Sequence, residues 1–206
     1  TGDWSSDVCS SDLTHFGHKN IVRGTSEWDL TGNHQSTRDF DTMEEHNYAL
    51  VKAINATVKS EDILYHLGDW SFGGHENIKK FRDQLNCQEI HLIFGNHDQH
   101  IEPIDSPYRN LFASCNHVKE LSFKVDRKYG VVGKQKLFLS HYAHRVWNQS
   151  HHGVIHLYGH SHDTLPGLGR SMDVGVNTNH MYPYHLDEIM DIMSKIPIKI
   201  RSGRAS

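Results

Sequence analysis

Apolar and polar positions along the chain follow two different periods, and each period predicts a different kind of element. Residues 42–58 place apolar side chains three and four positions apart behind Asp41 or Thr42 as an N-cap, which predicts an amphipathic helix. Helical spacing returns at residues 75–85 and 186–195. Short apolar runs instead predict strands at residues 63–67, 89–94, 154–158 and 171–176.

A further pair of strands is predicted in the second half of the chain. Residues 118–125 alternate between apolar and polar, as a half-buried strand does. DRKYG at 126–130 supplies a turn before a partner strand that includes KLFLS at 136–140, so a hairpin is expected. Strands alternating with helices early, and a hairpin late, favour an α/β domain with a mixed sheet, or two sheets, and helices outside.

The two ends of the chain differ from the rest. Residues 1–13, TGDWSSDVCSSDL, are polar, contain a near-repeat (SSDV, then SSDL) and follow neither period. They resemble translated sequencing adapter, as does RSGRAS at 201–206; an ordinary disordered terminus is the alternative. We expect a non-native or disordered segment at 1–13, a single domain at 14–200 and a non-native tail at 201–206.

Composition narrows the setting in which the protein works. The formal net charge is −4 without a basic stripe, so a nucleic acid is expected only as a substrate. The three cysteines are widely spaced and form no CxxC pair, which favours a reducing, cytoplasmic setting over a disulfide framework or a thiolate zinc site. No apolar run approaches the roughly 18 residues of a membrane helix, so no membrane partner is expected. The pattern carries no signal for an oligomeric state.

The 19 histidines are the compositional oddity, and several belong to short polar clusters that also hold Asp or Asn. DLTHFGH at 12–18 has no apolar run before it. The other clusters directly follow apolar runs: HLGDW at 66–70, IFGNHD at 93–98, FLSH at 138–141 and LYGHSHD at 157–163. Open α/β sheets build their sites at strand ends, and mixed oxygen and nitrogen ligands without thiolate pairs indicate more than one metal ion. The pattern therefore points to a two-metal hydrolase.

The order of these clusters resembles that of the calcineurin-like metallophosphoesterases, whose motifs are DxH, GD, GNH followed by D or E, a lone His, and GHxH. The resemblance covers about residues 12–190 and is most specific in the last four motifs. GHKN after the first motif, HYxxxxW at 141–147 and a late DVGV segment are similar to small bacterial and phage phosphoesterases. It implies two packed mixed β-sheets flanked by helices, here with the first strand missing or degraded. It also implies a binuclear metal-dependent phosphoester hydrolase, either a phosphodiesterase or a small-molecule phosphatase.

The resemblance also implies a role for each matching residue. The metal ligands would be Asp12, His15, Asp69, Asn96, His141, His160 and His162. Asp69 would bridge two ions. Asn96, His141 and His160 would complete one site. Asp12, His15 and His162 would complete the other. His97 would serve as general acid or transition-state donor, with Asp98 as the nearest partner to fix its tautomer.

Two divalent ions roughly 3.5–4 Å apart lower the pKa of a bridging water, so that a hydroxide can attack the phosphorus in line without a protein nucleophile. The histidine-rich, thiol-free ligand set suits Mn, Fe, Zn or Ni better than Mg, and Mn is expected to serve in vitro. The substrate is expected to be a small phosphoester. His18, Asn20 and Arg145 are candidate substrate-binding residues, with plain surface positions as the alternative.

Two departures from the family pattern affect these expectations. The first motif reads Asp12-Leu13-Thr14-His15, one residue longer than DxH, and a shift of one residue turns a strand side chain to the other face. Phe72 stands where many family phosphatases carry a further Asp, which disfavours a protein phosphatase. A catalytically impaired metal-binding domain of the same fold is therefore the alternative to an enzyme. A closed structural zinc module, which would be rich in cysteine, is disfavoured.

Overall fold

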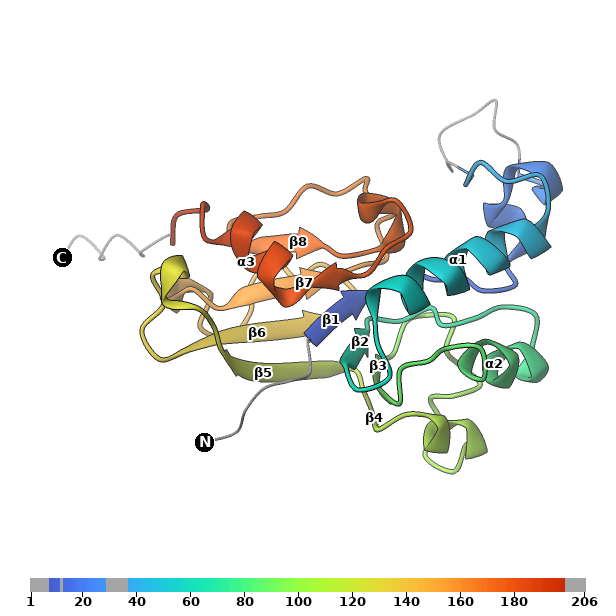
Figure 1. The fold of residues 1–206 in the computed structure, drawn as a ribbon, viewed down its shortest axis with the longest axis horizontal. Helices are drawn as coiled ribbons and strands as arrows, with labels where there is room; N and C mark the ends of the chain where they lie inside the picture. The colour runs from blue at the N-terminus through green and yellow to red at the C-terminus, as the bar shows by residue number, and fades with distance from the viewer. Residues whose placement is uncertain (1–7, 12, 29–36, 199–206) are drawn as a thin grey trace.

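The computed structural model describes residues 8–11, 13–28 and 37–198, and two β-sheets form its centre (Figure 1). The five-stranded sheet contains, in spatial order, β4 (Ser114–Asn116), β3 (Glu89–Ile93), β2 (Ile63–His66), β1 (Val8–Ser11) and β9 (Tyr184–His185). The four-stranded sheet contains β5 (Val118–Lys124), β6 (Lys134–Ser140), β7 (Ile155–Tyr158) and β8 (Ser171–Asp173). Strands β1 to β4 are parallel and β9 is antiparallel to β1, whereas β5 is antiparallel to β6 and β6 to β8 are parallel.

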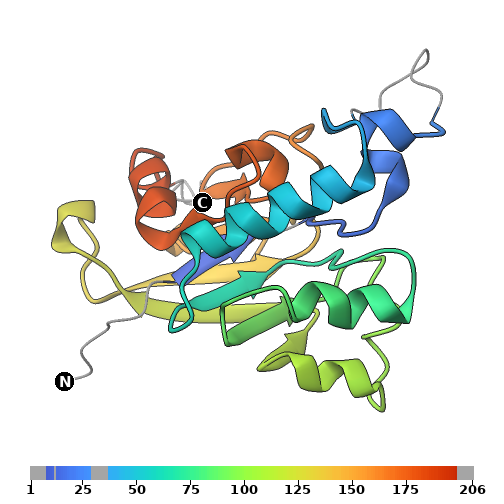
Figure 2. The same cartoon turned by 45° about the vertical axis from the view of Figure 1, so that its right-hand side comes forward.

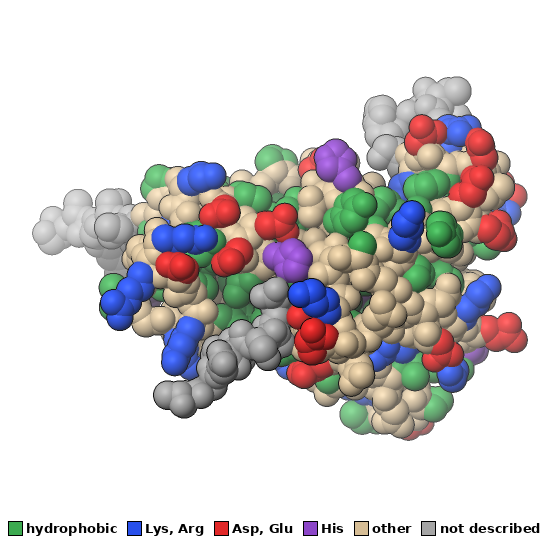
Figure 3. Space-filling view, viewed as in Figure 1, with side chains coloured by type: hydrophobic (Ala, Val, Ile, Leu, Met, Phe, Trp, Pro, Cys, Tyr) green, Lys and Arg blue, Asp and Glu red, His purple; other side chains and the backbone are tan. Residues whose placement is uncertain are grey.

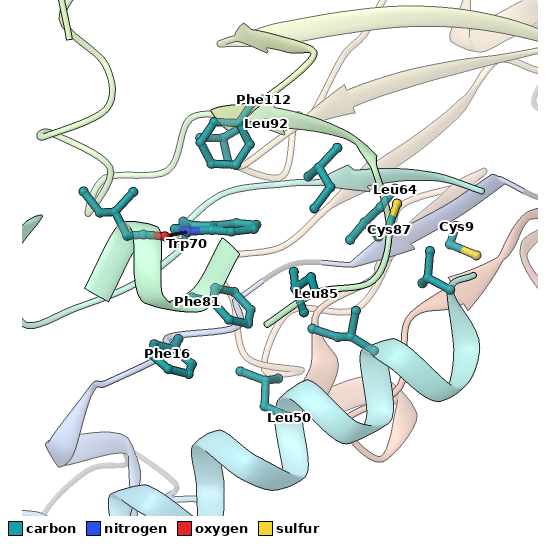
Figure 4. Packing of buried hydrophobic residues seen from close by; sticks show 14 of the residues in the cluster. Cys9, Phe16, Leu50, Leu64, Trp70, Phe81, Leu85, Cys87, Leu92 and Phe112 are labelled. Atoms are coloured by element: carbon teal, nitrogen blue, oxygen red, sulfur yellow. Dashed lines mark hydrogen bonds between the residues drawn. The ribbon is translucent and has the colours of Figure 1, made fainter. Parts of the chain in front are cut away.

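One apolar cluster joins the helices α1 (Met43–Thr57) and α2 (His75–Arg82) to the five-stranded sheet, along which α1 lies in Figure 2. Thr42 starts α1 with a capping box, because its hydroxyl accepts the Glu45 N–H and the Glu45 carboxylate accepts the Thr42 N–H. In Figure 4, Leu50 of α1 and Phe81 of α2 point into the same cluster as Trp70, whose indole N–H donates to the Ile78 carbonyl at 3.1 Å.

A second apolar cluster fills the space between the two sheets. Tyr65 and Ile93 from the five-stranded sheet share it with Leu137 and Leu157 from the four-stranded sheet. The helix α3 (Leu186–Met193) adds Met190 to the same cluster. Leu64, the neighbour of Tyr65 on β2, belongs to the helix-side cluster, as expected from the alternation of side chains along a strand. Two packed mixed sheets with helices outside confirm the predicted fold class.

Most elements lie where the periods predicted them, including the β5–β6 hairpin, which pairs Val118 with Ser140. The prediction that the first strand is missing or degraded is wrong for residues 8–11. They form β1, which pairs Cys9 with Leu64 of β2 and His185 of β9. β1 lies between β2 and β9 and pairs with both, so this short strand forms although it contains two serines and no long apolar run. The described residues do not include 1–7, Asp12 or the tail at 199–206, on which the remaining predictions for the two ends fall.

The sequence analysis considered a nucleic acid and a membrane as partners, and the surface charges and the helices are relevant to both. Acidic and basic side chains are interspersed on the face shown in Figure 3. Within the described part of the chain, no helix combines the length and apolar character needed to cross a membrane.

Candidate metal centre

The described residues that were predicted as metal ligands come together at one edge of the two sheets. Each lies in a loop after the carboxyl end of a strand: His15 after β1, Asp69 after β2, Asn96 after β3, His141 after β6, and His160 and His162 after β7. Because carboxyl ends of parallel strands meet at one edge, ligands far apart in sequence become neighbours. The remaining candidate, Asp12, lies outside the described residues.

His141 is the centre of one group of ligand atoms. Its Nδ1–H donates to the Leu67 carbonyl at 2.7 Å, so in the neutral ring Nε2 carries a lone pair. That nitrogen lies 3.6 Å from Asp69 Oδ2, 3.2 Å from Asn96 Oδ1 and 3.2 Å from His160 Nδ1. Carboxylate and amide oxygens thus face a nitrogen that has no hydrogen to share. A cation would satisfy these lone pairs, and Asp69, His141 and His160 bring ligand atoms within 4.8 Å of one another.

His15 and His162 form a second group on the other side of Asp69. Their Nε2 atoms lie 3.2 Å apart with the ring planes 10° from parallel, and His15 Nε2 lies 3.9 Å from Asp69 Oδ2. The other nitrogen of His15, Nδ1, is buried without a hydrogen-bond partner. One carboxylate oxygen of Asp69 is therefore within 4 Å of a ring nitrogen from each group.

Burial lowers the pKa of three of these histidines, which favours the neutral form that binds metals. It lowers the pKa of His162 to about 4 and that of His15 well below its ordinary value, and the buried Arg38 guanidinium acts in the same direction on both. Burial also lowers the pKa of His160, with the neighbouring His141 as the next cause. Neutral imidazoles beside one carboxylate fit divalent transition-metal ions.

Asp98 joins the two loops that follow β2 and β3. Its Oδ2 accepts the N–H groups of Asp69 at 2.9 Å and Gly95 at 2.8 Å, and its Oδ1 accepts the Trp70 N–H at 2.9 Å. Burial raises the pKa of Asp98 to about 7, against the opposing effect of these donors. The sequence analysis expected Asp98 to orient the His97 ring. In the structure the Asp98 carboxylate instead accepts backbone N–H groups. The His97 side chain is exposed, and the backbone N–H of His97 donates to Asp69 Oδ1 at 3.0 Å.

Close backbone approach explains the glycine before Asp69. Gly68 has φ +113°, and a Cβ there would lie 2.5 Å from His141 Nδ1 and 2.6 Å from the Gly95 nitrogen. Ligand residues themselves take left-handed backbone angles: His15 (φ 49°), Asp69 (φ 52°), His160 (φ 61°) and His162 (φ 47°). Such conformations cost energy in residues other than glycine and cluster at functional sites.

Two residues that hold the ligand loops were not singled out from the sequence. Arg38 is buried and donates to the carbonyls of Leu13 at 2.6 Å and Thr14 at 2.9 Å, directly before His15, and to Asn177 Oδ1 at 2.8 Å. No periodic or motif signal marks this arginine.

Asp173, at the end of β8, holds the loop of the GHxH motif. Its Oδ2 accepts the Ser161 hydroxyl at 2.7 Å and the Asp163 N–H at 3.2 Å. It begins the DVGV segment, and that segment was the signal available in the sequence.

A cavity of about 480 Å³ opens beside the ligands. His18, a predicted substrate-binding residue, lines it. The Asn20 side chain instead accepts the Glu27 N–H at 3.1 Å within its own loop, and Arg145 is exposed and outside the lining. Ile21, Trp28 and Phe72 contribute apolar side chains to its lining.

Comparison with known proteins agrees with this geometry. The calcineurin-like phosphoesterase superfamily domain matches residues 41–174, more than half of the chain. The chain belongs to this superfamily. Membership implies a metal-dependent hydrolase of phosphoesters, and the matched segment contains the ligand loops after β2, β3, β6 and β7.

Two similar proteins carry names that state no function. The uncharacterised protein MJ1445 of Methanocaldococcus jannaschii is 27% identical over an alignment of 191 residues, and the alignment covers 88% of each chain. The crystal structure of AQ665, a protein of unknown function from Aquifex aeolicus, has a TM-score of 0.63 at 18% identity. The similarity covers 91% of this chain and 100% of that one. It shows a shared fold.

Proposed function

We propose that the protein is a binuclear metal-dependent phosphoesterase acting on small phosphoesters, with nucleic acid a partner only as substrate. The observation that carries this proposal is the position of Asp69 Oδ2 between the two groups, 3.6 Å from His141 Nε2 and 3.9 Å from His15 Nε2. A carboxylate shared in this way offsets the repulsion between two nearby dications.

Each ion would have its own ligands besides Asp69. Asn96, His141 and His160 would hold one ion, and His15 and His162 would hold the other, with Asp12 as the expected further ligand. When bound, two ions chosen from Mn, Fe, Zn or Ni would activate a water molecule and neutralise charge on the phosphoryl oxygens.

Two histidines that line the cavity, His97 and His18, would donate a proton and a hydrogen bond to the substrate. His97 lines the cavity, and we assign it the donation of a proton to the leaving oxygen. The hydrogen bond from the His97 backbone N–H to Asp69 Oδ1 holds the His97 backbone beside Asp69. His18 Nδ1 accepts the Ile21 N–H at 3.0 Å, so the neutral ring carries its hydrogen on Nε2 and can donate it to a substrate oxygen.

Hydrolysis of bis-p-nitrophenyl phosphate and p-nitrophenyl phosphate with added Mn tests the proposal. Asp69→Asn should abolish activity and lower the bound metal, because the shared ligand loses its charge. Asp105→Asn is the matched control at an exposed carboxylate and should change neither. Activity that survives Asp69→Asn would refute the mechanism. Bound metal without turnover in the unaltered protein would favour the catalytically impaired metal-binding domain.

A further inference from the structure

We infer that the substrate is a phosphodiester in which one alcohol carries a planar ring, such as a nucleobase or an aryl group. The ring would pack on Trp28 and Phe72, which we call the aromatic wall, with Ile21 beside them. This inference rests on the proposed function, because the same cavity must first bind a phosphoryl group.

The aromatic wall begins directly at the metal centre. The Phe72 ring centroid lies 5.0 Å from that of His15 and 4.4 Å from that of His97. His18 then stands edge-on to Phe72, with centroids 3.9 Å apart, and its centroid lies 5.6 Å from that of Trp28. A phosphoryl group beside Asp69 would therefore have a continuous ring-lined surface next to it.

The loop that carries Trp28 is held in place by its own hydrogen bonds. Asn20 Oδ1 accepts the Glu27 N–H at 3.1 Å, and the Thr25 hydroxyl donates to the Lys19 carbonyl at 2.6 Å. The Ser26 hydroxyl accepts the Trp28 N–H at 3.2 Å. Ile21 is buried, whereas Trp28 is half-buried. A large, half-buried aromatic side chain on a hydrogen-bonded loop beside a cavity suits contact with a planar ligand.

Size and charge favour a diester with an organic group. A cavity of about 480 Å³ falls within the roughly 300–1,000 Å³ typical of sites for organic ligands, so it holds more than a phosphate. Among the described residues, its lining includes no Lys or Arg. The extra negative charge of a monoester would therefore meet no lining cationic side chain, whereas a diester carries one charge fewer.

Binding of two phosphonates tests the aromatic wall without turnover, because their carbon–phosphorus bond is not an ester. Phenylphosphonate and methylphosphonate share the charged group and differ in the ring. Calorimetric titration of the Mn-loaded protein should show phenylphosphonate binding about two- to tenfold more tightly. Trp28→Ala should remove this preference, and Trp28→Phe should keep most of it. Tyr48→Ala, which removes an exposed aromatic on α1, is the matched control and should leave it unchanged.

Kinetics give the second measurement. Thymidine 5′-p-nitrophenyl phosphate and methyl p-nitrophenyl phosphate release the same phenol, but only the first has a base. We expect kcat/KM to be about fivefold or more higher for the thymidine ester, and the advantage to disappear in Trp28→Ala. Equal binding of the phosphonates, or equal kcat/KM for both diesters, would overturn the inference and leave the proposed function intact. Failure to bind either phosphonate and to hydrolyse either diester would overturn both.

Discussion

The carboxylate of Asp98 accepts the backbone N–H of Asp69 at 2.9 Å. The same oxygen accepts the Gly95 N–H at 2.8 Å, so one side chain ties the loop after β2 to the loop after β3. Asp98 is 2% exposed, which leaves these N–H groups little access to water as a substitute acceptor. The position of Asp69, the proposed shared ligand, thus depends on Asp98, which lies outside the proposed ligand set.

Asp98→Asn should disturb this arrangement with almost no change in shape. The amide keeps one acceptor oxygen and turns the other into a donor, so at least one buried N–H group loses its partner. We expect the free energy of unfolding to fall by about 1–3 kcal/mol. Mn affinity should fall about tenfold, as when a group that orients a ligand is removed. Urea unfolding and Mn titration measure the two effects. Unchanged Mn affinity would show that Asp98 does not position Asp69.

Gly95→Ala should damage the centre by steric conflict. A Cβ at Gly95 would overlap the Asp69 carboxylate and approach His141 Cε1 to 2.9 Å. We expect a loss of about 1–3 kcal/mol in unfolding free energy and a clear loss of Mn affinity, because both ligands must move. Gly130→Ala is the control. Its Cβ would meet nothing within 4 Å although φ is +71°, so it strains the backbone and should leave Mn binding unchanged. Equal Mn affinity in the two variants would contradict the prediction.

The sequence predicted those elements and candidate ligands that have a local signal. The apolar runs before Asp69, Asn96, His141 and His160 marked both the strands and the points where their side chains emerge. β1 was missed because VCSS has no run or alternation of its own. Its place is set by pairing with β2 and β9, which are distant in the sequence.

The residues that hold the loops lack such local signals. Arg38 bonds to Asn177, 139 positions away, and nothing near Arg38 in the chain indicates that contact. Asp98 was given a role beside His97 because the two are adjacent in sequence. In the fold its bonds reach Asp69 and Trp70, 29 and 28 positions earlier. The candidate ligands could therefore be proposed from the sequence, whereas the residues that hold their loops are found only from the tertiary structure.

Arg38→Lys tests the support of the His15 loop. Lysine keeps the charge but presents a compact ammonium with three donors instead of a planar fork, so it cannot serve Leu13, Thr14 and Asn177 in the same geometry. We expect the unfolding free energy to fall by about 1–3 kcal/mol. The Mn stoichiometry should also decrease, because His15 is displaced. Arg127→Lys, at an exposed position, is the control and should behave like the unaltered protein. Full Mn loading in Arg38→Lys would argue against this role.

His156 should make the protein sensitive to acid. Its Nδ1–H donates to the Phe138 carbonyl at 3.1 Å, and its Nε2 accepts the His144 N–H at 2.9 Å, an arrangement that needs the neutral ring. Burial lowers the pKa of His156 to about 4 from an ordinary value of 6.5. Because the folded pKa is the lower one, the stabilisation is complete above about pH 6.5 and is lost as the pH falls toward 4.

Urea unfolding of the metal-free protein at pH 7 and pH 5 measures this effect without the release of metal. One such histidine should lower the unfolding free energy by about 2 kcal/mol between pH 6.5 and 5, at about 1.4 kcal/mol per pH unit. His66, whose pKa burial lowers to about 3, adds a loss in the same direction. His156→Gln removes one titrating ring, so it should be less stable at pH 7 but lose less on going to pH 5. His151→Gln, at an exposed histidine, should keep the full pH dependence. If His156→Gln lost as much stability as the unaltered protein, His156 would not be held neutral by the fold.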